Sequence, residues 1–166
     1  MRVSSLVVNK ASLVKKIITQ LGAELALFAK AARAAHAEAT HEQSKAENKY
    51  DTRGLEAAYL ARGQSRQAAE IEQAIQQFES LPVRAFGPQD PIDLSAFVEL
   101  ESKAGQTCYF IGPRAGGMEI RQGQRDVLVL TPNSPLGQQL VGRRQGERLR
   151  LEFGGTRDDY RIVAVA

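Results

Sequence analysis

The chain has 166 residues and a formal net charge of +3, with 43% hydrophobic and 25% charged residues. This size allows one ordinary domain or two small ones, and the charge falls short of the clustered basic face of a direct nucleic-acid binder. The single cysteine, Cys108, excludes an internal disulfide and a cage of thiolate metal ligands. The apolar run at residues 6–8 is too short for a secretion signal, and no stretch reaches the length of a membrane span, so we expect a cytoplasmic protein that does not enter membranes.

A long helix is predicted from about residue 10 to residue 42. Ser12 is its candidate cap, with Lys10 as an alternative first residue. Its apolar residues recur at steps of four or seven and change to alanine toward the far end: Leu13, Ile17, Leu21, Phe28, Ala31, Ala35 and Ala39. Alanine favours a helix but buries little surface, so the far end should be thin and weakly packed.

A second helix is predicted from about residue 51 to residue 78. Its apolar positions are Leu55, Tyr59, Ala68, Ile71, Ile75 and Phe78. Gly54 and Gly63 each weaken this helix by roughly 1 kcal/mol relative to alanine. Neither helix buries enough surface alone, so the two should pack antiparallel as a coiled-coil hairpin. The turn between them, residues 41–51, is the most polar part of the chain.

The composition changes at Pro82, because every proline of the chain lies at or beyond it. We therefore place a domain boundary there, with a helical domain at 1–81 and a β-rich domain at 82–166. Strands are predicted at 97–101, 107–111, 126–131, 148–153 and 160–165, and glycine turns at 105, 116–117 and 154–155. The unbroken apolar run Val127–Leu130 is typical of a strand that is covered on both faces.

A short helix is predicted between the third and fourth of these strands. Ser134 suits the N-cap, Pro135 the first helical position and Gly142 the C-terminal stop. Leu136 and Leu140 lie one turn apart, so this helix should lie across a sheet with both leucines on its buried face.

The stretch LTPNSPLGQQLVGRRQGE, residues 130–147, resembles the C-terminal domain of the bacterial transcript cleavage factors GreA and GreB. The shared pattern is a strand, a Ser-Pro step with small and apolar residues, and a glycine followed by basic residues and another glycine. The end of the chain, at Tyr160–Val163, also resembles that family. The resemblance spans nearly the whole chain and implies an α+β protein, with an N-terminal helical hairpin followed by an FKBP-like domain that carries one short helix.

The resemblance also implies a function. In such factors the C-terminal domain binds RNA polymerase near the mouth of the secondary channel, and the hairpin enters that channel. Acidic residues at the hairpin tip help to hold a catalytic Mg²⁺ and a water, so the polymerase cuts the 3′ end of a backtracked RNA. The factor is then no enzyme and needs no cofactor of its own, and it meets the RNA only indirectly. The polymerase-binding candidates are Ser134, Pro135, Leu136, Leu140, Arg143 and Arg144.

The hairpin tip departs from the family pattern. Glu47-Asn48 looks like the second half of the family motif, and in that alignment Ser44 stands where the family has an aspartate. An alignment anchored on the second helix instead moves the tip by several residues, closer to Tyr50 and Asp51. A hydroxyl is a poor substitute for a carboxylate as a Mg²⁺ ligand. The tip candidates are Glu42, Ser44, Glu47, Asn48 and Asp51, of which Glu47 and Asp51 are the expected ligands of a Mg²⁺ shared with the polymerase. Three outcomes stay open: an active factor with a rearranged tip, an inactive or inhibitory paralogue, or a regulator that competes for the channel.

Other interpretations compete with this one. The tip carboxylates suit an ordinary solvated turn, and Ser134 and Pro135 suit simple helix caps. An FKBP-like domain suggests a peptidyl-prolyl isomerase, although the chain has no tryptophan for such a pocket. A coiled-coil adaptor is a third alternative, but the alanine-rich far end argues against self-association and for a monomer. His36 and His41 lie on different helix faces without a thiol, which disfavours zinc, and Cys108 suits burial in a strand.

Overall fold

The computed structural model describes residues 8–40, 53–153 and 155–166. The chain divides into two compact units, one made of residues 1–17 and 77–166 and the other of residues 18–76. The second unit is a helical hairpin. The first unit contains a sheet, the short helix α3 (Pro135–Leu140) and one end of each long helix. We call these ends, residues 10–17 and 77–79, the helix roots. This arrangement confirms the predicted α+β class, in which long helices precede a β-rich domain.

Helix α1 (Lys10–Thr40) begins two residues before the predicted cap, at the alternative first residue Lys10. The Asn9 side chain is the cap, because its Oδ1 accepts a hydrogen bond from the backbone N–H of Ser12 at 3.0 Å. The Asn9 carbonyl also accepts the bond from the Leu13 N–H at 3.1 Å. The prediction of Ser12 as the cap was therefore wrong, and Ser12 instead supplies the N–H group that an N-cap side chain satisfies.

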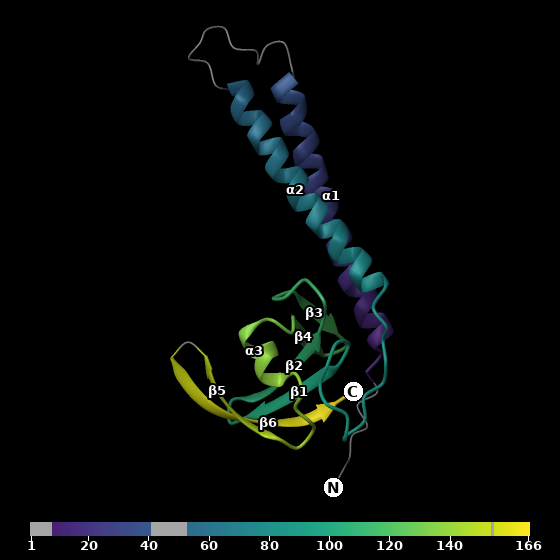
Figure 1. Cartoon of the computed structure of the whole chain (residues 1–166), viewed down its shortest axis with the longest axis vertical. Helices are drawn as coiled ribbons and strands as arrows, with labels where there is room; N and C mark the ends of the chain where they lie inside the picture. The colour runs from purple at the N-terminus through teal and green to yellow at the C-terminus, as the bar shows by residue number, and fades with distance from the viewer. Residues whose placement is uncertain (1–7, 41–52, 154) are drawn as a thin grey trace. The chain divides into compact units, whose positions relative to one another are not determined.

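Helices α1 and α2 (Arg53–Glu79) lie side by side in the hairpin unit (Figure 1). Their buried and half-buried residues alternate at steps of three and four, which is the coiled-coil pattern. In this unit the seam includes Leu21, Leu25, Phe28, Ala32, Ala35 and Ala39 from α1, and Ala57, Ala61, Gln64, Ala68, Ile71, Ala74 and Ile75 from α2. The seam changes from large residues to alanine toward the far end, as the sequence pattern predicted.

The assignment of α2 residues to the seam was partly wrong. Leu55 and Tyr59 are 53% and 60% exposed, whereas Ala57 and Ala61 are buried. In α1, Ala32 rather than Ala31 is buried. In this stretch of α2 the large apolar residues thus lie on the exposed face of the helix and the alanines on the buried face.

The sheet has six strands in the order β3-β4-β2-β1-β6-β5. Their bounds are Phe97–Ser102 for β1, Gly105–Ile111 for β2, Glu119–Gln122 for β3, Arg125–Leu130 for β4, Arg148–Phe153 for β5 and Thr156–Val165 for β6. Neighbouring strands are antiparallel except β2 and β4, which are parallel. The five predicted strands are confirmed. Strand β3 was missed, since it has four residues of which Ile120 alone is buried.

Both faces of the central strands are covered. One face packs on α3 in the main core: Phe86, Ile92, Ala96, Val98, Leu100, Tyr109, Ile111, Leu130, Leu136, Leu140, Leu149, Leu151, Ile162 and Val165. On the other face the helix roots contribute Phe78, whose ring lies against Gly112, and Lys16, whose ammonium donates to the Arg121 carbonyl at 3.0 Å. Val127 and Val129 of β4 are fully buried, as the apolar run predicted.

We predict that Gly63→Ala and Gly22→Ala each stabilise the hairpin by about 1 kcal/mol, because both glycines lie inside long helices and alanine is the better helix former. A Cβ at either position would meet no atom within 4 Å. Urea unfolding followed by far-ultraviolet circular dichroism measures the change.

The control is Gly112→Ala, whose Cβ would approach the Phe78 ring at 3.0 Å, so this variant should lose stability. A loss of stability in Gly63→Ala as well would mean that the outer surface of α2 is packed against something.

Candidate functional site

The segment that carries the family resemblance forms a tight capped helix. Ser134 has an extended backbone, and its Oγ accepts a hydrogen bond from the Gly137 N–H at 3.0 Å. The same hydroxyl donates to the Thr131 carbonyl at 2.7 Å. Pro135 occupies the first turn, and Gly142 has a φ of 89° just after the helix end. The predicted cap, first residue and stop are thus confirmed.

Gly137 is the residue that allows the backbone of α3 to pack against Thr131. A Cβ at this position would lie 2.0 Å from the Thr131 carbonyl oxygen and 2.8 Å from the Ser134 hydroxyl. The backbone of α3 therefore approaches the end of β4 so closely that only glycine fits. The third residue after Ser134 thus has a geometric reason to be glycine.

The loop after α3 is fixed by bonds to an earlier segment of the chain. Gly142 N–H donates to the Ile92 carbonyl at 2.9 Å, and Ile92 N–H donates to the Arg143 carbonyl at 2.7 Å. The Arg144 guanidinium donates through Nε to the Gln89 carbonyl at 2.9 Å, and Arg143 forms an ion pair with Glu147 at 3.5 Å. Both arginines are therefore held in place although Arg144 is exposed.

The six predicted binding residues divide into two groups. Leu136 and Leu140 are buried in the main core, and Leu140 is 0% exposed, so their side chains pack α3 onto the sheet. Pro135 and Arg144 are exposed, and Ser134 and Arg143 are half-buried. Val141, the residue after the helix, is 37% exposed. We call Pro135, Val141, Arg143 and Arg144 the α3 surface. Contact of this surface with a partner stays a prediction.

The predicted tip residues Glu42, Ser44, Glu47, Asn48 and Asp51 lie outside the described residues. His41 lies outside them as well. Among the residues that are described, no group of three or more His, Cys, Asp or Glu side chains is placed to hold a metal ion. No described helix combines the length and the apolar character needed to cross a membrane.

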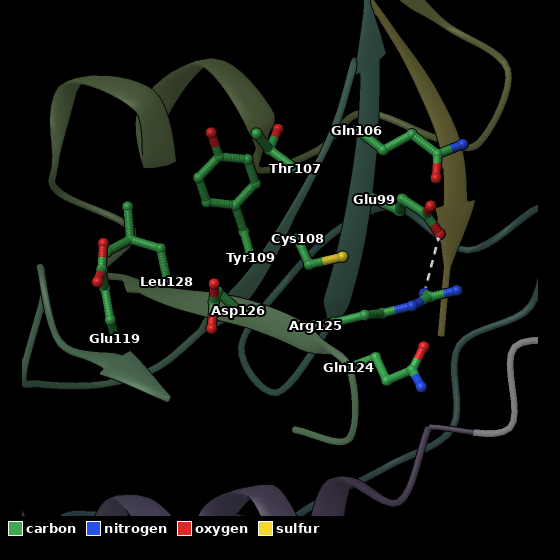
Figure 2. A pocket seen from close by; sticks show the side chains of 10 residues that line it. All are labelled: Glu99, Gln106, Thr107, Cys108, Tyr109, Glu119, Gln124, Arg125, Asp126 and Leu128. Atoms are coloured by element: carbon green, nitrogen blue, oxygen red, sulfur yellow. Dashed lines mark hydrogen bonds and ion pairs between the residues drawn. The ribbon is translucent and has the colours of Figure 1, made fainter. Parts of the chain in front are cut away.

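A pocket of about 440 Å³ opens over β1 to β4 (Figure 2). Its residues are Glu99, Gln106, Thr107, Cys108, Tyr109, Glu119, Gln124, Arg125, Asp126 and Leu128. The Glu99 carboxylate is 3% exposed and accepts a bond from the Arg125 guanidinium at 3.4 Å, with Cys108 next to the pair in Figure 2. Tyr109 is the pocket's one aromatic residue, which differs from the aromatic lining expected of a prolyl isomerase.

The charged groups next to Cys108 in this pocket are the paired Glu99 and Arg125, which we interpret as a structural ion pair. Burial and the neighbouring Glu99 carboxylate raise the pKa of the Cys108 thiol, and Arg125 offsets part of that rise. The thiol is therefore protonated at neutral pH and is a weak nucleophile. The buried Cys108 agrees with the structural role that the sequence favoured.

Comparisons with known proteins agree with the resemblance. The transcription inhibitor protein Gfh1 of Thermus thermophilus is 31% identical over 124 residues, which are 70% of this chain and 72% of that protein. The Gfh1 of Thermus aquaticus is also 31% identical over 124 residues, with 70% and 71% covered. This chain belongs to the Gre-like transcription factor family that includes Gfh1. No protein-family model matches the chain.

Solved structures of Gre-like factors were also compared. The crystal structure of GreA factor homolog 1 of Thermus thermophilus has 24% identity and a TM-score of 0.38, with 90% of this chain and 94% of that chain covered. The GreA/GreB elongation factor of Nitrosomonas europaea has 20% identity and a TM-score of 0.36, with 62% and 78% covered. At these TM-scores the structural likeness adds no argument, so membership of the Gre-like family rests on the sequence identity.

We predict that Gly137→Ala destabilises this Gre-like factor by about 3 kcal/mol, because the added methyl overlaps the Thr131 carbonyl. Urea unfolding measures the change. Gln138→Ala, one residue later and exposed, is the matched control and should change stability by less than about 0.5 kcal/mol. Equal stability of the two variants would contradict the close approach.

We also predict that Arg125→Met destabilises the protein by about 2 kcal/mol, because it leaves the Glu99 carboxylate buried without its cation. In the double variant Glu99→Gln with Arg125→Met no charge is left behind, so most of that stability should return. Additive losses in this double-mutant cycle would show that the two side chains do not interact.

Proposed function

We propose that this Gre-like factor binds RNA polymerase and inhibits transcription without stimulating transcript cleavage. The observation that carries the proposal is the 31% identity to proteins named as transcription inhibitors, over 70% of the chain. The factor is not itself an enzyme and acts as a cytoplasmic monomer. The nascent RNA is affected only through the polymerase.

The chemistry of the hairpin tip supports inhibition over cleavage. A metal that assists phosphoryl transfer takes oxygen ligands, most strongly carboxylates. The Gre pattern places an aspartate where this chain has Ser44, so the tip has lost one such ligand while Glu47 and Asn48 remain. A tip with a weaker hold on the shared Mg²⁺ occupies the channel without completing the cleavage site.

The α3 surface is the proposed docking face. Its two arginines are held by Gln89 and Glu147, so little side-chain freedom is lost when an acidic partner binds. Leu136 and Leu140 contribute by fixing α3 from the core side, and Ser134 by capping it. The proposal therefore assigns polymerase binding to the α3 surface and the lack of cleavage to the hairpin tip.

Stimulation of cleavage is the second candidate function. It is favoured by the three carboxylates that the tip retains within the polar turn, Glu42, Glu47 and Asp51. In this case Glu47 and Asp51 would supply the ligands of the polymerase-bound Mg²⁺, with a spacing that differs from the family's.

We predict that the wild-type factor lowers RNA synthesis by its cognate polymerase and leaves the cleavage rate of a backtracked complex unchanged. Arg144→Glu should weaken polymerase binding at least about tenfold, since it places a carboxylate on the docking face. Glu47→Ala and Asp51→Ala should bind as tightly as wild type. Fluorescence anisotropy with labelled factor and a gel assay of RNA cleavage measure the two quantities.

The control is Arg150→Glu, which reverses a charge on the exposed β5 strand and should leave binding unchanged. Faster cleavage with wild type, lost in Glu47→Ala, would overturn inhibition in favour of the second candidate. Absence of polymerase binding would overturn both. Loss of binding in the tip variants would identify their side chains as docking contacts.

A further inference from the structure

The first residue of α1 is a buried lysine. Lys10 is 8% exposed, and its ammonium donates hydrogen bonds to the backbone carbonyls of Arg84, Ser95 at 2.8 Å and Ala166 at 3.1 Å. These carbonyls belong to the linker after α2, the turn before β1 and the residue after β6. Three segments that are distant in sequence therefore converge on one side chain, and all of them lie in the sheet unit.

An aromatic ring completes the surroundings of this ammonium. The Lys10 nitrogen lies 4.8 Å from the centre of the Phe86 ring, and the Arg84 guanidinium carbon lies 4.1 Å from the same centre. An ammonium has as many N–H donors as there are carbonyls here, so each donor has an acceptor. A ring face attracts a cation in addition.

Among the ion pairs of the described residues, none joins Lys10 to an Asp or Glu side chain. Burial and the nearby Arg84 guanidinium lower the pKa of Lys10 to about 8. Aromatic ring faces are also used by proteins to hold organic ammonium ligands.

The backbone of Ser95 has an unusual conformation at the point where its carbonyl accepts the hydrogen bond from Lys10. Ser95 is fully buried and has a φ of 70°, a left-handed conformation that costs about 1 kcal/mol for a residue with a Cβ. Its N–H donates to the Ile111 carbonyl at 2.8 Å, while its own carbonyl accepts from Lys10. Such strain persists only where the surroundings determine the conformation from several sides.

We propose that the three carbonyls and the Phe86 ring form a cage for an organic ammonium, which Lys10 fills as a tethered ligand, and that filling this cage latches the first turn of α1 to the sheet unit. When the cage is empty, the first turn of α1 and the linker at 82–86 open while the sheet stays folded. This latch is independent of the polymerase-binding proposal.

The test removes the tethered ligand and supplies it in solution. Lys10→Ala deletes the side chain beyond Cβ, and n-propylammonium has the atoms that replace Cγ to Nζ. We expect Lys10→Ala to lower the thermal unfolding midpoint by about 5 °C. Propylammonium, at a concentration on the order of tens of millimolar because so small a ligand binds weakly, should recover at least about half of that shift.

Two controls separate a cation cage from general packing. 1-Propanol has the same length without the charge and should give no recovery. Lys16→Ala removes an exposed lysine that also donates to two acceptors, the Arg121 carbonyl and the Gln122 side chain, and propylammonium should not rescue it. Equal recovery with propanol, or no recovery with propylammonium, would overturn the cage.

Hydrogen exchange tests the latch itself in the full chain. Lys10→Met keeps an apolar stem and removes the ammonium. We expect amide exchange in residues 11–14 to rise at least about tenfold, with exchange in β2 and β4 unchanged. A uniform rise across the sheet, or unchanged protection of the first turn, would overturn the latch and leave Lys10 as an ordinary core residue.

Discussion

Close approach of the α3 backbone to the end of β4 is the constraint on which the globular unit depends. The Thr131 carbonyl lies where a Cβ of residue 137 would be, so the chain turns through the Ser134 cap into α3 only because residue 137 is glycine. That turn places Leu136 and Leu140 on the main core and covers one face of the sheet. With the helix roots on the other face, the central strands become apolar on both sides, which is why the β4 sequence is an unbroken apolar run.

The same constraint fixes the α3 surface. Because Gly142 and Arg143 exchange hydrogen bonds with Ile92, the loop after α3 cannot move without breaking the edge of the core. Arg144 reaches back to the Gln89 carbonyl for the same reason. A surface held this way is suited to specific docking, since the partner does not have to order it first. The hairpin has a different construction, because the alanines of its seam gain little from burial and four of its larger apolar residues, Leu27, Leu55, Tyr59 and Leu60, stay exposed.

Much of the fold could be predicted from the sequence where local chemistry decides the outcome. Ser134, Pro135 and Gly142 mark a helix by capping and φ preferences that act within a few residues. The hairpin was predictable in outline, but its seam was not. Large apolar residues are the usual guide to a buried stripe, whereas here Ala57 and Ala61 are buried and Tyr59 is exposed. The Asn9 cap was missed because Ser12 is an equally good cap residue.

The features that escaped prediction depend on contacts between distant segments. The three acceptors of Lys10 lie 74, 85 and 156 positions after it in the sequence. Nothing near Lys10 in the sequence indicates that its side chain is buried. A lysine at a helix start is normally a solvated charge. Likewise, the ion pair of Glu99 with Arg125 follows from strand pairing rather than from spacing.

The arrangement explains why one architecture can serve either inhibition or cleavage. Docking requires a rigid surface, and the α3 surface obtains its rigidity from the core of the sheet unit. Cleavage requires metal ligands, and the sequence places the oxygen donors in the polar turn of the hairpin. In the proposed function the two requirements fall on separate residues, so serine in place of aspartate at position 44 would weaken the Mg²⁺ ligand set and leave the packing around Gly137 untouched. Under that proposal, a factor altered in this way would still compete for the polymerase, which is the property that an inhibitor needs.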